Sequence, residues 1–187
     1  MLVRGRSPGL AKFGRPRLAR VHPRERLYRR LDEGLEHPAV WVSGPPGAGK
    51  TALIASYLEA RKLRALWYQV DGGDTDPVVC CHFLEVAARR LAPQPGSELL
   101  LLGPVQVPDL ASYLRHFFSA FYDGLSTLQI LVMDNTQEAL SSAELRQLLR
   151  TAIREAPEHI RLLIASRTRP PSDFSRLRVS DGLAAID

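Results

Sequence analysis

Cysteine is scarce in this chain, because the 187 residues include only Cys80 and Cys81. Adjacent cysteines on a helix seldom pair with each other, and two sulfur ligands are too few for a structural zinc site. This scarcity argues against a disulfide framework and against a zinc-dependent fold. We expect both cysteines to be small, reduced residues in or near the core of a cytoplasmic protein.

Long apolar runs are also missing. No segment reaches the ~20 residues that a membrane-spanning helix needs, and the N-terminus lacks the apolar region of a signal peptide. The hydrophobic content of 45% and the charged content of 24% are ordinary for a globular protein. We therefore expect no membrane partner, and the length suits one α/β domain with a sizeable core.

Acidic residues are almost absent from the first 30 positions, where Glu25 stands against ten lysines and arginines. The net charge of this segment is +9, which leaves −4 for the remaining 157 residues. A basic arm can contact nucleic acid, but only Phe13 and Tyr28 are available to stack on bases. We predict a basic, flexible leader over residues 1–20, with at most weak DNA contact, followed by a folded domain over residues 21–187.

The sequence does contain a complete phosphate-binding loop. The motif G-x-x-x-x-G-K-[ST] is filled by Gly44, Pro45, Pro46, Gly47, Ala48, Gly49, Lys50 and Thr51. Its glycines let successive backbone N–H groups turn toward a phosphate, Lys50 brings positive charge, and the Thr51 hydroxyl can bind Mg²⁺. We expect these residues, and Ala52 after them, to contact ATP or ADP at the N-terminus of a helix.

Apolar periodicity predicts strands that alternate with helices, an order typical of α/β proteins with a mostly parallel sheet. Strands are expected at residues 39–43, 64–70, 128–133, 160–165 and 183–186. Helices are expected at residues 24–36, 50–62, 77–91, 109–124 and 141–155. In the helix over 77–91, the side chains expected to reach the core are Val78, Phe83, Val86 and Leu91.

A second motif lies after the apolar strand that ends at Met133. Asp134 comes directly after it, at the strand end where ligands bind in open α/β sheets, and is the expected Mg²⁺ anchor together with Thr51. The next residue is Asn135, which can hydrogen-bond a water molecule but cannot accept its proton at neutral pH. Glu138 is either a substitute for that base or a solvated loop carboxylate. We therefore predict slow ATP hydrolysis and long nucleotide occupancy.

Ser166 and Arg167 come after the next strand along the chain. An arginine here has the charge and the fork geometry to detect a γ-phosphate, and we predict this role for Arg167. The alternative is an ordinary surface arginine at a strand end, and Arg169 is a nearby competitor for the role.

Taken in order, these residues resemble the nucleotide-binding domain of the MalT-like STAND proteins, which are signal-transduction ATPases with numerous domains. The matching segments are Lys12-Phe13, Pro16-Arg17-Leu18, Pro23 to Leu27, residues 44–51, Trp67-Tyr68 through Asp71 and Asp74, Asp134 to Glu138, Ser166 to Pro171, and Arg176-Leu177-Arg178. The resemblance implies a P-loop NTPase three-layer sandwich with five strands in the order 5-1-4-3-2. It also implies that Val21 and Arg24 lie near the adenine, with Pro23 in place of the relatives' glycine.

The family further implies an ATP/ADP switch with slow ATPase activity, as part of a transcription regulator that binds DNA through other domains. Self-association or further domains of the same protein are the expected partners, besides the nucleotide and Mg²⁺. Two alternatives stay open, a small-molecule P-loop kinase and a binding module that retains nucleotide without turnover. The kinase lacks support because no cluster of arginines occurs between Arg115 and Asp134.

Overall fold

The computed structural model describes residues 12–16, 22–91, 109–125 and 127–187. They form an α/β fold around a five-stranded sheet with the strand order β2-β3-β4-β1-β5. The strands are β1 (Ala39–Ser43), β2 (Ala65–Gln69), β3 (Ile130–Asp134), β4 (Arg161–Ser166) and β5 (Leu183–Ile186). All pairings between neighbouring strands are parallel. The predicted order 5-1-4-3-2 is confirmed, read from the opposite edge.

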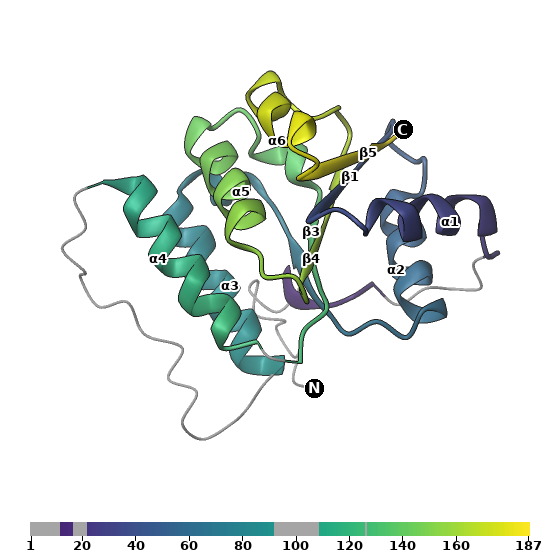
Figure 1. Ribbon diagram of the computed structural model, residues 1–187, viewed down its shortest axis with the longest axis horizontal. Helices are drawn as coiled ribbons and strands as arrows, with labels where there is room; N and C mark the ends of the chain where they lie inside the picture. The colour runs from purple at the N-terminus through teal and green to yellow at the C-terminus, as the bar shows by residue number, and fades with distance from the viewer. Residues whose placement is uncertain (1–11, 17–21, 92–108, 126) are drawn as a thin grey trace, which may run out of the picture.

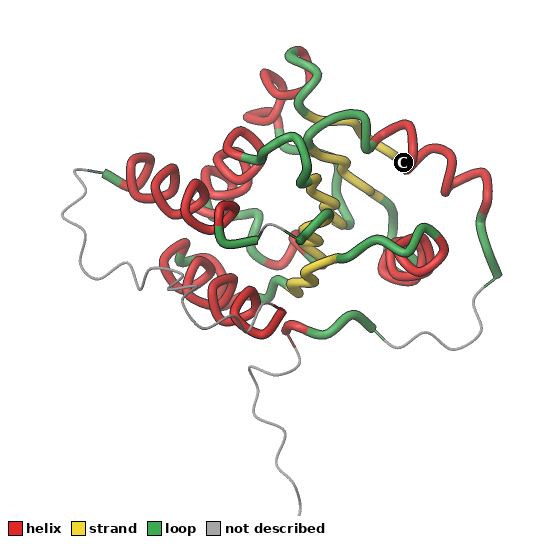
Figure 2. The backbone as a smooth tube through the Cα atoms, turned by 60° about the horizontal axis from the view of Figure 1, so that its bottom comes forward, coloured by secondary structure: helices red, strands yellow, loops and turns green. Residues whose placement is uncertain are grey.

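Helices cover both faces of the sheet, which makes three layers (Figures 1 and 2). The helices α1 (Glu25–Gly34) and α2 (Lys50–Ala60) pack on one face, and their buried side chains share a cluster with Val40 and Val42 of β1. On the other face lie α3 (Pro77–Leu91), α4 (Leu110–Asp123), α5 (Ala143–Glu155) and the short α6 (Ser175–Val179). There the cluster includes Ala39 and Trp41, so alternate residues of β1 serve the two faces.

The central strands are buried on both faces, as their apolar runs predict. Every residue of β1 and β3 is buried, including Ser43 and Asp134 at their carboxyl ends. A strand buried in this way has no solvent-facing side, so its side chains are apolar along its length. Polar residues therefore enter only where the strands end, and that edge is where the candidate site lies.

The buried face of α3 differs from the expected one. Val78 is 52% exposed and Leu91 is 46% exposed, whereas Phe83 and Val86 are only partly buried. The buried residues of this helix, most of them small, are Pro77, Cys80, Cys81, Leu84, Glu85, Ala87 and Ala88. Small side chains let a helix lie close to its neighbours. Close packing of this face therefore explains why the larger Val78 and Leu91 are turned toward solvent. The prediction that both cysteines are free core residues is confirmed.

Some features of the fold have no counterpart among the sequence predictions. These are α6 and the 3-10 turns at Gly72–Thr75, Thr136–Glu138 and Ser172–Phe174. The residues Lys12–Pro16, within the predicted leader, lie against the domain, where Phe13 packs beside Tyr68 and Phe83. Within the described residues, no helix is both long and apolar enough to cross a membrane.

Candidate functional site

The carboxyl ends of three neighbouring strands meet at one edge of the sheet. The phosphate-binding loop comes after β1, Asp134 ends β3, and Arg167 comes directly after β4. Between them lies a cavity of about 390 Å³. Its lining residues are Pro46, Gly47, Gly49, Lys50, Thr51, Ala52, Asp134, Asn135, Gln137 and Arg167. Segments that are far apart in the sequence thus share one cavity because parallel strands end at the same edge.

The loop takes its shape from two glycines. Gly47 and Gly49 both have a φ of +79°, a left-handed conformation that side chains rarely adopt. Gly49 is also the residue before α2, so the loop leads directly into the helix N-terminus. No atom lies within 4 Å of the place where a Cβ on Gly47 would sit, so the space beside this residue is open. The loop has the form needed to turn N–H groups toward an anion.

The Lys50 side chain points back to the loop that precedes it. Its Nζ donates to the carbonyl oxygen of Gly44 at 2.6 Å and to that of Pro45 at 3.1 Å. Burial lowers the pKa of Lys50, and the Arg167 charge lowers it further, whereas the Asp134 carboxylate raises it. Two positive charges therefore face the same cavity, which favours an anionic ligand.

Thr51 and Asp134 meet at the base of the cavity. The Thr51 hydroxyl donates to Asp134 Oδ2 at 2.9 Å, and the Asn135 N–H donates to Oδ1 at 2.8 Å. Asp134 is only 5% exposed, and burial raises the pKa of its carboxyl although Thr51, Asn135 and Lys50 oppose this rise. A hydroxyl and a carboxylate at this distance are oxygen ligands of the kind that Mg²⁺ prefers.

These two residues fit a metal that shares its ligands with phosphate and water. Among the described residues there is no group of three or more His, Cys, Asp or Glu side chains that could hold an ion by themselves. Mg²⁺ in nucleotide sites is usually held by one or two protein oxygens plus phosphates and water, so the donor set suits it.

Asn135 is held on both sides of its amide. Its φ of +63° is left-handed, a region that asparagine tolerates better than most residues. The Nδ2 atom donates to the Val70 carbonyl at 3.4 Å, and Oδ1 accepts from Nε2 of Gln137. The side chain is therefore tied to the protein at each end and is not directed freely into the cavity.

Gln137 is not among the predicted site residues, yet it joins two of them. While its Nε2 donates to Asn135, its Oε1 accepts from the Arg167 N–H at 3.0 Å. The amide thereby connects the residue after Asp134 with the residue after β4. No spacing rule points to a glutamine in this position, and only the pairing of β3 with β4 brings the two loops together.

Arg167 faces the cavity and Arg169 does not line it. The Arg167 Nη2 lies 3.5 Å from Oε1 of Glu138, and both side chains are partly exposed. Arg169 instead pairs with Asp187 at 2.9 Å beside a neighbouring cavity of about 380 Å³. Arg167 lines both cavities, so it lies at the boundary between them.

The other predicted residues lie around this centre. Gly44 and Pro45 line the neighbouring cavity with Arg167, and Ala48 is in the loop between them and Gly49. Arg24 lies on the loop, where its Nη1 donates to the Ala48 carbonyl at 3.1 Å. Glu138 lies beside Arg167 rather than in the cavity lining. Val21 falls outside the described residues.

A family model described as Nephrocystin 3, N-terminal, matches residues 24–167 and so includes the loop, Asp134 and Arg167. The chain belongs to this family. The match begins at Arg24, beside the loop, and ends at Arg167, so it spans the whole of the candidate site. The segment that matches the nephrocystin 3 N-terminal family therefore includes most of the described fold.

The resemblance to MalT-like proteins is also confirmed. The chain is 29% identical over 178 residues to the HTH-type transcriptional regulator MalT of Serratia proteamaculans, which covers 92% of this chain. It is 26% identical over 178 residues to MalT of Cronobacter sakazakii, with 94% of this chain covered. The chain spans 19% of the length of each of these two relatives.

Among solved structures, a Walker-type ATPase of Pyrococcus abyssi matches 77% of this chain and 45% of its own, at 16% identity and a TM-score of 0.49. DnaA of Aquifex aeolicus with bound AMPPCP matches 91% of this chain and 48% of its own, at 15% identity and a TM-score of 0.43.

Proposed function

We propose that this chain is an ATP/ADP-binding switch module of a STAND-type ATPase that hydrolyses ATP slowly. The observation that carries the proposal is the contact between Thr51 and Asp134, which joins the phosphate-binding loop to a carboxylate from another strand within one cavity. A phosphate loop alone needs no such partner, whereas a magnesium-nucleotide site needs both.

Each residue of the site has a role in this proposal. The N–H groups around Gly47 and Gly49 would surround the phosphates, and Lys50, which donates to two loop carbonyls, would donate to phosphate oxygens instead. Thr51 and Asp134 would hold Mg²⁺, which would supply positive charge that offsets the phosphate oxygens. Arg24 lies beside the loop and, with Val21, is proposed to contact the adenine.

Arg167 is proposed to report whether the γ-phosphate is present. It shares the cavity with Lys50, and its backbone is tied through Gln137 to Asn135. A ligand switches a protein only when it binds two conformations with different affinity. An arginine at the boundary of two cavities provides such a difference, because only ATP offers it a third phosphate.

Slow hydrolysis is expected from the residues that would have to activate water. The Asn135 amide is engaged by Val70 and Gln137, and it cannot take a proton at neutral pH. The Glu138 Oε1 already faces Arg167 at 3.5 Å and accepts from Gln137 at 3.2 Å. The proposed module therefore holds and senses a nucleotide better than it consumes one.

The second candidate is a binding module that retains its nucleotide without any turnover. The engagement of both Asn135 and Glu138 favours it over an active ATPase, and a small-molecule kinase lacks support because no cluster of arginines occurs between Arg115 and Asp134. In that case the nucleotide is a structural ligand, and exchange of ADP for ATP has no effect on conformation.

We place the module in a cytoplasmic transcription regulator, because the named relatives are HTH-type transcriptional regulators. Other domains of the same protein, or other copies of the chain, are then the partners that respond to the switch. Contact with DNA is assigned to those other domains.

Equilibrium binding of fluorescent ADP and ATP analogues in the presence of Mg²⁺ tests the proposal. Lys50→Met should weaken binding about 10–100-fold, the range for the loss of a hydrogen bond to a charged group. Lys62→Met removes the same charge from an exposed position after α2 and should leave affinity unchanged. Equal affinity for all three proteins would reject the assignment of the loop as the nucleotide site.

A further inference from the structure

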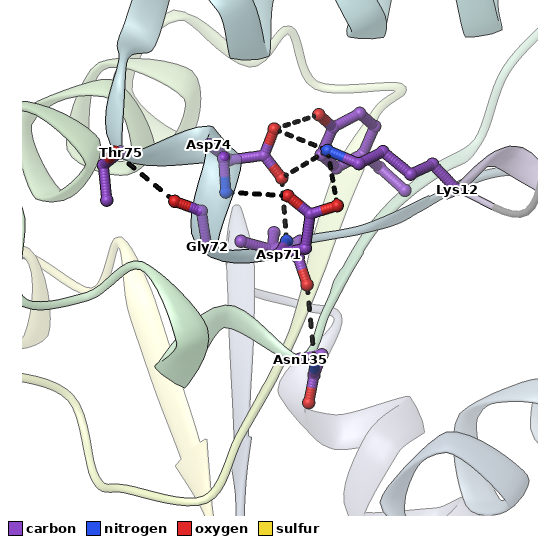
Figure 3. A network of polar contacts seen from close by, with 9 residues as sticks. Lys12, Asp71, Gly72, Asp74, Thr75 and Asn135 are labelled. Carbon is purple, nitrogen blue, oxygen red and sulfur yellow. Dashed lines mark hydrogen bonds and ion pairs between the residues drawn. The ribbon is translucent and has the colours of Figure 1, made fainter. Parts of the chain in front are cut away.

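A polar network lies beside the candidate site and joins the N-terminal segment to it (Figure 3). Lys12 Nζ lies 2.9 Å from Asp71 Oδ2, and 3.0 and 3.2 Å from the two carboxylate oxygens of Asp74. The Lys12 side chain is only 13% exposed and Asp74 is fully buried. A lysine is costly to bury unless it is paired, and here two carboxylates pair with it.

Aromatic rings hold the lysine in position. Its Nζ lies 4.7 Å from the centre of the Phe83 ring and 5.7 Å from that of Tyr68. The next residue, Phe13, packs against the same two rings. Burial lowers the pKa of Lys12, but the contacts with Asp71 and Asp74 outweigh burial and raise it, so the side chain is a fixed cation.

Asp74 holds the turn that comes after β2. Its carboxylate accepts from Tyr68 Oη at 2.7 Å and from the Asp71 N–H at 2.8 Å, in addition to Lys12. The Asp71 carboxylate in turn accepts from the Gly73 N–H at 2.9 Å, which closes a capping box over Gly72–Thr75. The cation that balances both carboxylates of this turn comes from Lys12, about sixty positions earlier in the chain.

Asp71, which caps the turn, comes directly after Val70, and Val70 forms hydrogen bonds with Asp134 and Asn135. The Val70 N–H donates to the Asp134 carbonyl at 2.9 Å, and its own carbonyl accepts from Asn135 Nδ2. Asn135 then donates its N–H to the Asp134 carboxylate, which also accepts from Thr51. A continuous series of contacts thus runs from Lys12 to the proposed magnesium ligands, and it does not pass through the phosphate-binding loop.

We propose that Lys12 is a positioning residue for the magnesium side of the site, acting through Asp74, the Gly72–Thr75 turn and Val70 on Asn135 and Asp134. The inference rests on the proposed function and deepens it. Because the series reaches Asp134 and bypasses residues 44–49, loss of Lys12 reduces the contribution of Mg²⁺ to nucleotide affinity. Affinity for ADP without metal, which depends on the loop, stays the same.

The test compares wild type with Lys12→Met, which keeps most of the alkyl chain against Phe83 and removes the charge. ADP affinity is measured with Mg²⁺ and with a chelator, and the ratio of the two dissociation constants gives the magnesium effect. This ratio should fall about fivefold or more, since coupled sites commonly differ by that factor. Lys12→Arg, which restores a cation, should recover most of it.

Arg61→Met is the matched control. Arg61 comes directly after α2 and pairs with Asp32 of α1 at 2.6 Å, and its aromatic neighbours are Tyr28 and Tyr57, neither of which belongs to the turn. The substitution removes one positive charge, as Lys12→Met does, although it breaks one ion pair where Lys12→Met breaks two. An equal fall in the magnesium effect in Arg61→Met would assign the change to overall charge and overturn the inference.

Amide hydrogen exchange gives a readout that needs no nucleotide. In folded Lys12→Met, exchange of the Val70 N–H should speed up about fivefold or more, as local contacts open. The Leu53 N–H, which donates to the Gly49 carbonyl at 2.8 Å where the loop meets α2, should exchange as in wild type.

Unchanged exchange of the Val70 N–H overturns the inference, as does faster exchange of this N–H together with an unchanged magnesium effect. If wild type binds no nucleotide, the proposed function fails, and Val70 exchange still decides whether Lys12 holds Val70.

Discussion

The hydroxyl of Thr51 lies 2.9 Å from Oδ2 of Asp134, although 83 positions separate the two residues in the chain. The contact exists because β1 and β3 are parallel and are separated in the sheet only by β4, so their carboxyl ends lie at the same edge. It unites a phosphate-binding loop with a buried carboxylate. Substitutions of this pair and of the residues around it should therefore change nucleotide and metal affinity in distinct ways.

Replacement of Thr51 by the isosteric valine should remove the metal-dependent part of nucleotide affinity. The hydroxyl is lost while the shape of the first helical turn is kept, and loss of a group around a metal commonly costs about 10–100-fold in metal affinity. Calorimetric titration of ADP with and without Mg²⁺ measures the effect. Ser56→Ala removes another hydroxyl of α2, which donates to the Leu53 carbonyl at 3.0 Å. It should behave as wild type, and a similar loss in both variants would contradict the assignment.

Arg167→Ala should weaken ATP binding more than ADP binding. The guanidinium faces the cavity, and only ATP presents a γ-phosphate to it. A preference for ATP lost by about tenfold would match one charge-assisted hydrogen bond. Arg169→Ala is the control, because Arg169 pairs with Asp187 and does not line this cavity. Competition titrations with both nucleotides measure the ratio, and equal losses for ATP and ADP would remove Arg167 from the sensor role.

Asp134→Asn should raise thermal stability at pH 7 while abolishing the magnesium effect. Burial raises the pKa of Asp134, so its charge is less favourable in the folded state than in the unfolded state. The stability that this carboxyl contributes is present at low pH and is lost as the pH rises through the folded pKa. Each kcal/mol regained shifts the melting temperature by about 2–4 °C in a chain of this size.

Asp32→Asn should change stability in the opposite direction. The hydrogen bonds from Arg61 hold the pKa of Asp32 below its usual value, so this carboxylate stabilises the protein above its unfolded pKa and loses that effect in acid. Melting curves of both variants at pH 7 and at acidic pH check the two signs. Destabilisation by Asp134→Asn at neutral pH would show that the buried charge is not costly.

Much of the fold and the centre of the site could be predicted from the sequence. The apolar runs of β1 and β3 are long enough to mark strands buried on both faces, and the loop motif specifies the turn and helix after β1. The strand order came from the resemblance to known proteins rather than from periodicity. Asp134 and Arg167 stand at or just after the carboxyl ends of parallel strands, and the loop after β1 brings Lys50 and Thr51 to the same cavity.

The rest depends on contacts that no local pattern encodes. The predicted buried face of α3 is wrong because a stripe of cysteines and alanines allows closer packing than Val78 and Leu91 do. The role of Gln137 depends on the direction of an amide between two loops. Local composition places Lys12 in a solvated leader, because its partners Asp71 and Asp74 lie about sixty positions away.

Our proposal is that the site binds Mg-nucleotide and turns it over slowly, because Asn135 is engaged by Val70 and Glu138 by Arg167. The most direct test is the rate of phosphate release from the chain saturated with MgATP, divided by the amount of nucleotide bound. We predict stoichiometric binding with a rate below ~1 s⁻¹, the low end of ordinary enzyme turnover. A faster rate that is abolished by Lys50→Met, or no binding of nucleotide at all, would contradict this proposal.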